Sequence, residues 1–193
     1  MTRIGAAVLA AGASRRLGRP KQLLIHRGKP LVRAAVECVC AAQVSVRAVV
    51  LGSSANEVRA VLADCRVDIL ENSEWEEGMA SSIRRAIDWA DAQRCDALLL
   101  LLCDQPQLDA EHLNRLIAEH AQSRLPVASI YAGKCGVPAL FPRSWFAKLG
   151  ALQGDSGASR LLNAGGPLAG VPWPEGEFDI DSVENARRLL VVE

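Results

Sequence analysis

Short apolar runs alternate along this chain with stretches in which apolar residues recur at helical spacing. A continuous apolar run of about four to eight residues favours a buried strand. Such runs cover Ile4 to Ala11, Val46 to Leu51, Val67 to Leu70, Ala97 to Cys103 and Val127 to Tyr131. Because strand and helix patterns alternate, the sequence predicts an α/β fold with a mainly parallel sheet.

The stretches between the runs have the periodicity of amphipathic helices. The positions that carry it are Val32, Ala35, Val36 and Val39; Val58, Val61 and Leu62; Ile83, Ala86, Ile87 and Ala90; and Leu113, Leu116 and Ile117. We expect the last of these helices from Asp109 to Ala121. The run Ala97 to Cys103 is the most apolar, so we expect it to be the central strand, covered on both faces.

The chain has 193 residues, 50% of them hydrophobic, which is enough for a sizeable core. We therefore expect a single domain over residues 1–193. The 22 basic and 22 acidic residues balance, so composition provides no general attraction to nucleic acid or to an anionic membrane. No apolar run approaches the roughly 20 residues of a membrane span, and no secretory signal is evident. We expect a cytoplasmic protein with neither a nucleic-acid nor a membrane partner.

The six cysteines and three histidines form no disulfide or metal-binding pattern. The cysteines are scattered through apolar segments without a C-x-x-C pair, so we expect reduced thiols and no zinc site. We expect His112 and His120 on the solvent-facing side of their helix.

The strongest local signal is the loop that follows the first apolar run. It holds three small residues, Gly12, Ser14 and Gly18, among four cations. The cations are Arg15, Arg16, Arg19 and Lys21. Glycine lets backbone N–H groups approach a ligand, and consecutive N–H groups form an anion-binding concavity. The loop therefore predicts a polyphosphate site. Its spacing fits neither the Walker A loop, G-x-x-x-x-G-K-S/T, nor the dinucleotide fingerprint, G-x-G-x-x-G.

An aspartate directly follows the predicted central strand, in the triplet Asp104-Gln105-Pro106. Ligands of open α/β sheets bind at the carboxyl ends of strands. Mg²⁺ takes oxygen ligands, often one or two carboxylates together with substrate phosphates. The structural alternative is an aspartate that only initiates a turn. Because Asp109 is available to cap the next helix, and the phosphate loop also follows a buried strand, we expect Asp104 to hold Mg²⁺.

The stretch from Leu9 to Lys21 resembles the signature L-A-A/G-G-x-S-x-R-M/L-G-x-x-K of nucleotidyltransferases with a Rossmann-like core. More narrowly, it is similar to the molybdenum cofactor cytidylyltransferases and their guanylyltransferase relatives, and the resemblance extends over essentially the whole chain. It implies a three-layer Rossmann-like nucleotidyltransferase fold with helices on both faces of the sheet. It also implies that Arg16 and Lys21 act in catalysis. The implied nucleotide contacts here are Leu9, Ala10, Ala11, Gly12, Ala13, Ser14 and Lys21.

A second loop, from Glu71 to Ser82, resembles the family element N-x-x-W/Y-x-x-G-M/L-x-S/T-S. The resemblance implies that Gly78, Ser81 and Ser82 contact the base or the ribose. Local chemistry offers another interpretation, in which one of the serines caps the helix that follows. Trp75 is either a wall of the substrate pocket or an anchor for the loop.

Two further elements resemble the acceptor side of the family. The stretch from Gly133 to Phe141 matches G-x-x-G-x-P-x-L/F, although a hairpin turn followed by a strand explains it equally. A later stretch matches G-D-x-G-A-R except that Ser159 stands in place of the arginine, which is either missing or shifted to Arg160. The implied acceptor-binding residues are Gly136, Pro138, Gly154, Asp155 and Gly157.

The segment from Glu177 to Ser182 resembles the family element D-I-D-T. It implies that Asp179 or Asp181 supplies a second metal ligand beside Asp104. Alternation in an extended segment places both carboxylates on the same side, so the choice between them stays open.

Taken as a whole, the resemblance implies transfer of CMP from CTP to the phosphate of the molybdenum-bound pterin cofactor, with Mg²⁺ as cofactor and pyrophosphate as product. CTP is favoured because cytidylyl members tend to have Ala-Ala-Gly, as at Ala10 to Gly12, where guanylyl members have Ala-Gly-Gly. A Cβ at Ala11 narrows the pocket in favour of a pyrimidine. The implied partner is a molybdenum hydroxylase or its insertion chaperone. The alternatives are another nucleoside triphosphate, a sugar or polyol phosphate acceptor, or a nucleotide-binding assembly factor without turnover.

Overall fold

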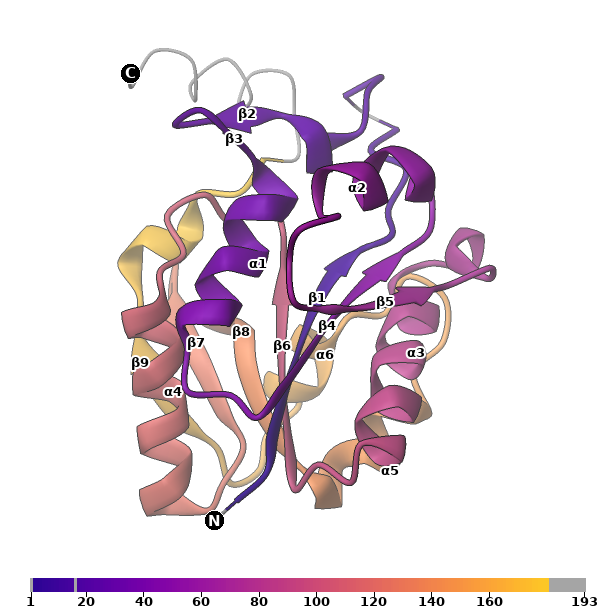
Figure 1. The fold of residues 1–193 in the computed structure, drawn as a ribbon. Helices are drawn as coiled ribbons and strands as arrows, with labels where there is room; N and C mark the ends of the chain where they lie inside the picture. Colours follow the sequence, from indigo (N-terminus) through magenta and orange to yellow (C-terminus); the bar gives the residue numbers. More distant parts are fainter. Residues whose placement is uncertain (1, 16, 181–193) are drawn as a thin grey trace.

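The computed structural model describes residues 2–15 and 17–180, and these form a twisted sheet between two layers of helices (Figure 1). Within this part of the chain seven strands form one sheet, in the order β5-β4-β1-β6-β8-β7-β9. The strands are β1 (Ile4–Ala10), β4 (Val46–Leu51), β5 (Asp68–Glu71), β6 (Ala97–Leu102), β7 (Val127–Tyr131), β8 (Lys134–Pro142) and β9 (Ala169–Pro172). A small hairpin joins β2 (Ile25–His26) to β3 (Lys29–Pro30).

The sheet is mainly parallel, as the sequence predicts. Strand β1 pairs in parallel with β4 and β6, β4 with β5, and β7 with β9. Only β8 runs against its neighbours β6 and β7 in the described sheet, because the turn at Gly133 makes β7 and β8 a hairpin. Strand β6 is in the middle of the strand order, which confirms the expected central strand.

Helices cover both faces of the sheet, which also confirms the prediction (Figure 1). Helices α1 (Leu31–Ala41) and α4 (Ala110–Ser123) lie on one face. Helices α3 (Met79–Ala92), α5 (Phe146–Gly150) and α6 (Ala158–Leu162) lie on the other. The remaining helices of the described chain are α2 (Ala55–Val61) and the 3₁₀ turns η1 (Lys21–Leu23), η2 (Trp75–Glu77), η3 (Arg143–Trp145) and η4 (Pro174–Glu177).

Strand β1 shows how the sequence builds this three-layer arrangement. Its side chains alternate between the two faces, because successive residues of a strand point in opposite directions. Ala6 and Val8 join the core beneath α1 and α4, whereas Ala7 and Leu9 join the core beneath α3 and α5. All seven residues of the strand are buried, so an uninterrupted apolar run is required here.

Helix α4 begins as expected, but its histidines do not lie where the sequence places them. Asp109 caps the helix, since its side chain accepts a hydrogen bond from the backbone N–H of His112 at 2.7 Å. His112 and His120 are only 1% and 5% exposed, so their predicted solvent-facing position is wrong. The ring of His112 stacks on Trp173 at a centroid distance of 4.7 Å. The segment after β9 therefore covers the side of α4 that holds His112, a side that the helical pattern of apolar residues predicted to face solvent.

Burial of His112 predicts a dependence of stability on pH. Burial lowers the pKa of His112 from 6.5 to about 4, and the nearby charge of Arg115 acts in the same direction while Asp109 opposes it. In the unfolded chain His112 binds a proton near pH 6.5, whereas in the folded chain it binds one only near pH 4. The free energy of unfolding therefore falls as the pH drops through this interval. We expect a loss of up to about 3 kcal/mol in the free energy of unfolding.

Urea denaturation at a series of pH values measures this effect, with His112→Gln as the matched variant. Glutamine retains an N–H donor toward Ser129 but does not titrate. The difference in stability between the two proteins should shrink as the pH falls from 6.5 to 4. A constant difference over that range contradicts the assignment of the effect to His112.

No helix in the described residues has the length and apolar character needed to cross a membrane. None of the six cysteines is joined in a disulfide in the described structure. Cys95 and Cys103 are buried, whereas Cys40 is exposed.

Candidate functional site

A cavity of about 580 Å³ opens where β1 and β6 end. These strands are neighbouring and parallel, so their carboxyl ends meet at one edge of the sheet, where ligands of open α/β sheets bind. The described residues that line it are Leu9, Ala10, Ala11, Gly12, Ala13, Arg15, Lys21, Gln22, Trp75, Glu76, Gly78, Met79, Ser82, Leu102, Cys103, Asp104 and Asp155. Segments that are distant in sequence thus converge on one concave surface.

The loop after β1 is held in shape by Gln22, a residue that the sequence analysis missed. Its side chain is 1% exposed, and Nε2 donates to the carbonyls of Ala10 at 2.9 Å and of Gly12 at 2.7 Å. These two bonds fix the carbonyls on both sides of Ala11, which lines the cavity. No local pattern reveals this role, because the partners of Gln22 are backbone groups ten and twelve residues earlier.

Ser14 closes the same loop instead of lining the cavity. Its backbone has a φ of +53°, and its Oγ accepts a hydrogen bond from the backbone N–H of Lys21 at 2.9 Å. The Ser14 hydroxyl also lies 3.5 Å from the side-chain oxygen of Gln22. The polar loop therefore turns back on itself and brings Lys21 next to the end of β6.

Lys21 and Asp104 form an ion pair on the floor of the cavity. Asp104 is 4% exposed, and Oδ2 is the carboxylate oxygen that contacts Lys21. The other oxygen, Oδ1, is buried without a hydrogen-bond partner in the described structure. A buried carboxylate oxygen without a partner is costly, so this atom is available for a cation or a donor from a ligand.

The segment that follows η4 is hydrogen-bonded directly to Asp104 at the end of β6. The backbone N–H of Ile180 donates to the carbonyl of Asp104 at 3.1 Å, which brings the neighbouring Asp179 close to the end of β6. Burial raises the pKa of Tyr131, and the charges of Asp179 and Asp104 add to that increase. Both carboxylates therefore lie within electrostatic reach of one side chain. The predicted residues Arg16 and Asp181 lie outside the described residues.

No group of three or more His, Cys, Asp or Glu side chains suited to a metal exists within residues 2–15 and 17–180. Oxygen atoms of a bound phosphate could add to the ligands of a cation at Asp104, because Mg²⁺ commonly combines one or two carboxylates with substrate phosphates.

Hydrogen bonds from β7 and from the loop after β6 hold the predicted acceptor segment around Pro138 in place. Ser129 donates to the carbonyl of Pro138 at 2.6 Å and lies 2.7 Å from Nε2 of His112. Since the Ser129 proton is used by Pro138, Nε2 of His112 must be the donor in the second bond. The amide of Gln105 and the hydroxyl of Tyr131 both donate to the carbonyl of Val137, each at 3.0 Å.

The second predicted nucleotide loop forms one wall of the cavity. Trp75 packs against Gly52, where an added Cβ would lie 2.5 Å from the Trp75 Cβ and 2.8 Å from the carbonyl of Ala11. Trp75 also lines the cavity, so the structure is compatible with both roles offered for it from the sequence, and a contact with substrate stays a prediction. Because Gly52 has no side chain, the loop that holds Trp75 can pack against the end of β1.

Gly78 joins this wall to the loop at Asp155. Its φ is +122°, and an added Cβ would lie 2.6 Å from the carbonyl carbon of Gly154 and collide with Oδ1 of Asp155. The backbone N–H of Ala80 donates to the carbonyl of Gly154 at 3.0 Å, and the N–H of Gly154 donates to Glu77 at 3.2 Å. The two loops therefore form one rigid rim around the cavity.

Replacing Gly78 by alanine should separate these loops. The substitution imposes a left-handed backbone on alanine and a collision with Asp155. We expect a loss of about 2 kcal/mol in the free energy of unfolding and at least tenfold weaker nucleotide binding. Gly133→Ala is the matched control, because it also has a positive φ, +69°, but has open space around its Cβ and lies away from the cavity. Equal losses of binding in both variants would contradict the proposed contact.

The cavity gathers many of the predicted site residues, but not all of them. Those that line it are Leu9, Ala10, Ala11, Gly12, Ala13, Lys21, Gly78, Ser82, Asp104 and Asp155. The predicted residues of the described chain that are not among the lining residues are Ser14, Ser81, Gly136, Pro138, Gly154, Gly157 and Asp179. Neither Ser81 nor Ser82 caps α3, whose N-cap is Gly78 without a side-chain bond. Residues that the sequence analysis did not predict also contribute, chiefly Gln22, Glu76, Met79 and Leu102.

Comparison with known proteins gives one family match. A family model described as "MobA-like NTP transferase domain" matches residues 6–169. Nicotine blue oxidoreductase of Paenarthrobacter nicotinovorans is 33% identical over 204 residues, covering 95% of this chain and 94% of the relative. Purine catabolism protein PucB of Bacillus subtilis (strain 168) is 29% identical over 187 residues, covering 91% and 90%. Molybdenum cofactor guanylyltransferase of Rhodobacter capsulatus is 32% identical over 126 residues, covering 63% of each chain.

Solved structures with the same fold cover the whole chain. Rv0371C of Mycobacterium tuberculosis H37Rv, in a complex with manganese, has a TM-score of 0.81 at 30% identity and covers 100% of both chains. A nucleotidyl transferase from Methanothermobacter thermautotroptrophicus (Mth528) also has a TM-score of 0.81, at 26% identity and 100% coverage of both chains. These similarities confirm the predicted nucleotidyltransferase fold.

Proposed function

This chain belongs to the MobA-like NTP transferase domain family, and we propose that it transfers CMP from CTP to the terminal phosphate of a molybdenum-bound pterin cofactor. Membership of the family identifies the chain as a nucleotidyltransferase. The identities of the nucleotide, the acceptor and the metal are what we propose. We propose a single domain, residues 1–193, for this activity.

The observation that carries the proposal is the convergence of the glycine loop, Lys21 and Asp104 on one cavity. A nucleotidyl transfer must bring two anions together and stabilise charge on the departing pyrophosphate. Backbone N–H groups of the loop and the ammonium of Lys21 are donors for the β- and γ-phosphates. Arg16, by family resemblance, would add a second cation there. Catalysis would rest on positioning and electrostatic stabilisation.

The residues at Asp104 fit a divalent cation. Two observations support this: in the described structure one oxygen of the buried Asp104 carboxylate has no hydrogen-bond partner, and Asp179 lies on the segment that is bonded to the Asp104 backbone. We propose that Asp104 holds Mg²⁺ together with Asp179 or Asp181. When bound, the cation would neutralise phosphate charge and polarise the α-phosphorus. A manganese complex is known for one solved structure of this fold.

The acceptor needs little help from a general base. A phosphate monoester has a charge near −1.5 to −2 at neutral pH, so its oxygen can attack the α-phosphorus without losing a proton first. The attacking oxygen forms the new P–O bond while the bond to pyrophosphate breaks. The cavity lining is consistent with this, because neither histidine of α4 belongs to it.

The preference for CTP rests on the first loop. Ala11 lines the cavity and is held between two carbonyls that Gln22 fixes, so its Cβ narrows the space for the base. A pyrimidine fits such a space better than a purine. We propose Leu9, Ala10, Ala11, Gly12, Ala13, Gly78 and Ser82 as nucleotide contacts.

The acceptor side is proposed at two segments, one around Pro138 and one around Asp155. Gly136 and Pro138 lie in the segment braced by Ser129 and Gln105, and Asp155 faces the cavity from the loop that also holds Gly154 and Gly157. A molybdenum cofactor guanylyltransferase is among the relatives, which supports a pterin acceptor. The product would pass to a molybdenum hydroxylase or its insertion chaperone.

Pyrophosphate release tests the reaction, acceptor and base together. Protein, Mg²⁺ and the molybdenum-loaded pterin cofactor are combined with CTP, GTP, ATP or UTP in turn. Release with CTP alone is the expected result. Release with another nucleotide keeps the reaction class and contradicts the argument from Ala11. If pyrophosphate is released only when a sugar phosphate replaces the pterin, the proposed identity of the acceptor is wrong.

A nucleotide-binding role without transfer is the second candidate. One relative of nearly full coverage is named an oxidoreductase, so membership of this sequence group extends beyond proteins named as transferases. Tight nucleotide binding without pyrophosphate release, for every acceptor supplied, would favour this candidate.

A further inference from the structure

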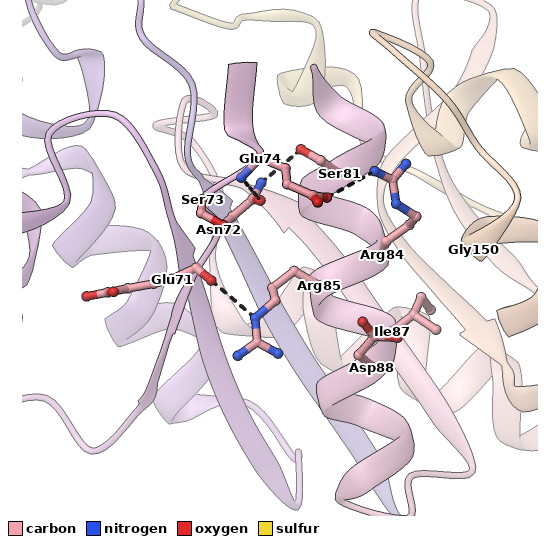
Figure 2. A pocket seen from close by; sticks show the side chains of 10 residues that line it. All are labelled: Glu71, Asn72, Ser73, Glu74, Ser81, Arg84, Arg85, Ile87, Asp88 and Gly150. Carbon is pink, nitrogen blue, oxygen red and sulfur yellow. Dashed lines mark hydrogen bonds and ion pairs between the residues drawn. The ribbon is translucent and has the colours of Figure 1, made fainter. Parts of the chain in front are cut away.

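The buried side chain of Asn72 links the end of β5 to the start of α3. Asn72 is 6% exposed, and its backbone N–H donates to the carbonyl of Leu51 at 2.8 Å. Its side-chain oxygen accepts a hydrogen bond from the backbone N–H of Glu74 at 3.0 Å (Figure 2). Because a backbone N–H can only donate, the oxygen of the amide must face Glu74. The amide nitrogen must therefore face α3.

The amide nitrogen of Asn72 donates to two hydroxyls on α3. Its distances are 2.9 Å to Oγ of Ser81 and 3.1 Å to Oγ of Ser82. Both serines are buried, at 3% and 4% exposure. An amide nitrogen has two hydrogens, one for each hydroxyl. Each serine oxygen therefore accepts from Asn72 and must direct its own proton elsewhere.

The two serine protons have different destinations. Ser81 donates to the carbonyl of Gly78 at 2.9 Å and lines a separate cavity of about 300 Å³, beside Asn72 and Arg84 (Figure 2). Ser82 instead lines the cavity at the ends of β1 and β6, which we call the main cavity. No hydrogen bond in which the Ser82 hydroxyl donates is seen among residues 2–15 and 17–180; its recorded bond is the one it accepts from Asn72. The two serines of the motif are thus not equivalent.

We propose that Asn72 is a positioning residue that fixes Ser82 as a hydrogen-bond donor to the nucleotide. This inference rests on the proposed function, since it requires a nucleotide in the main cavity. The group that Ser82 recognises is an acceptor on the nucleoside, namely a carbonyl oxygen or an unprotonated ring nitrogen. Ser81 contributes to the shape of the loop through Gly78 and does not contact the nucleotide.

Direct binding measurements test the difference between the two serines. Calorimetric titration with CTP, GTP, ATP and UTP first establishes the nucleotide that the wild-type protein prefers. Ser82→Ala should raise the Kd for that nucleotide five- to tenfold, the loss expected for one hydrogen bond. Ser81→Ala is the matched control, because the residue is adjacent, equally buried and bonded to the same amide. Its Kd should stay within about twofold of the wild type.

A double-mutant cycle tests whether Asn72 acts through Ser82. Asn72→Asp keeps the acceptor for Glu74 but removes both N–H donors, so the Ser82 proton is drawn to the new carboxylate. The added negative charge also weakens binding, but it does so equally with serine or alanine at position 82 and cancels in the cycle. We expect Asn72→Asp to weaken binding at least fivefold more in the presence of Ser82 than in the Ser82→Ala background.

The possible results of these experiments test the proposed function, the donor role of Ser82 and the positioning role of Asn72 separately. A wild-type protein that binds none of the four nucleotides overturns the proposed function. A wild-type protein that binds one of them, with equal losses for Ser81→Ala and Ser82→Ala, overturns the donor role of Ser82. Equal effects of Asn72→Asp in both backgrounds overturn the positioning role of Asn72. If Asn72→Asp does not fold, judged by circular dichroism, Asn72→Ala, which removes the same N–H donors, replaces it in the cycle, and equal effects in both backgrounds again overturn the positioning role.

Discussion

Asp104→Asn is expected to reduce the rate of metal-dependent pyrophosphate release by about 10³-fold. The substitution keeps the size of the side chain and removes its charge, so it removes the carboxylate proposed to hold the cation. A metal ion at a reacting phosphate contributes several kcal/mol of charge stabilisation, and 1.36 kcal/mol corresponds to tenfold in rate. The half-maximal Mg²⁺ concentration should rise in parallel.

The same variant should fold at least as well as the wild type. Asp104 is 4% exposed, and Oδ1 has no hydrogen-bond partner in the described structure, so burial of the charge is costly. A neutral amide lowers that cost. The ion pair between Lys21 and Asp104 is weakened, but the Lys21 side chain is 20% exposed, so water solvates its charge. We expect a melting temperature equal to or above that of the wild type, which would show that the charge serves function at the expense of stability.

Asp109→Asn is the matched control for this experiment. It makes the same chemical change five residues further on, where Asp109 only caps α4. Asparagine is an equally good N-cap, so activity should not change. A near-normal rate for Asp104→Asn, or an equal loss in both variants, would remove Asp104 from the metal site.

Lys21→Met is expected to lower kcat/KM by 10² to 10³-fold. Methionine fills a similar volume without charge, so the loss reports the ammonium group that we propose for the β- and γ-phosphates. Loss of one preorganised donor to a developing negative charge typically costs this much. Most of the loss should appear in kcat, because the contact strengthens as charge develops on pyrophosphate.

Lys29→Ala is the corresponding control for charge. Lys29 lies outside the cavity and pairs with Glu37 at the surface, where ion pairs contribute little. Its removal changes the net charge by the same amount and should leave kcat/KM within about twofold. An unchanged kcat/KM in Lys21→Met would exclude Lys21 from the reaction.

Several features of the site were open to prediction because they depend on short sequence patterns. The glycine loop, Lys21 and Asp104 each directly follow or border an apolar strand, and parallel strands bring their carboxyl ends together. The structure places these residues on one cavity, as expected. The cap at Asp109 was also predictable, since its partner is three residues away.

Other features depend on contacts between distant segments, and no local pattern contains them. Gln22 acts on carbonyls ten and twelve residues earlier, and a glutamine in a short turn gives no sign of burial. His112 is buried because Trp173, sixty-one positions later in the chain, stacks on it. Asn72 distinguishes Ser81 from Ser82 only through its orientation, which Glu74 fixes.

The sequence by itself predicted the buried strands β1, β4, β5, β6 and β7, the helices α1 to α4 that follow them and the loops that carry the chemistry, whereas the three layers were implied by the family resemblance. It could do so because a strand needs apolar residues in a run, a helix needs them at its own period, and a phosphate loop needs glycine at fixed spacing. Tertiary structure alone decided which of the motif residues reach the cavity and in which direction their hydrogen bonds point. Ser14, Ser81 and Ser82 are chemically identical side chains, and only the groups that the fold places around each one give it a different task.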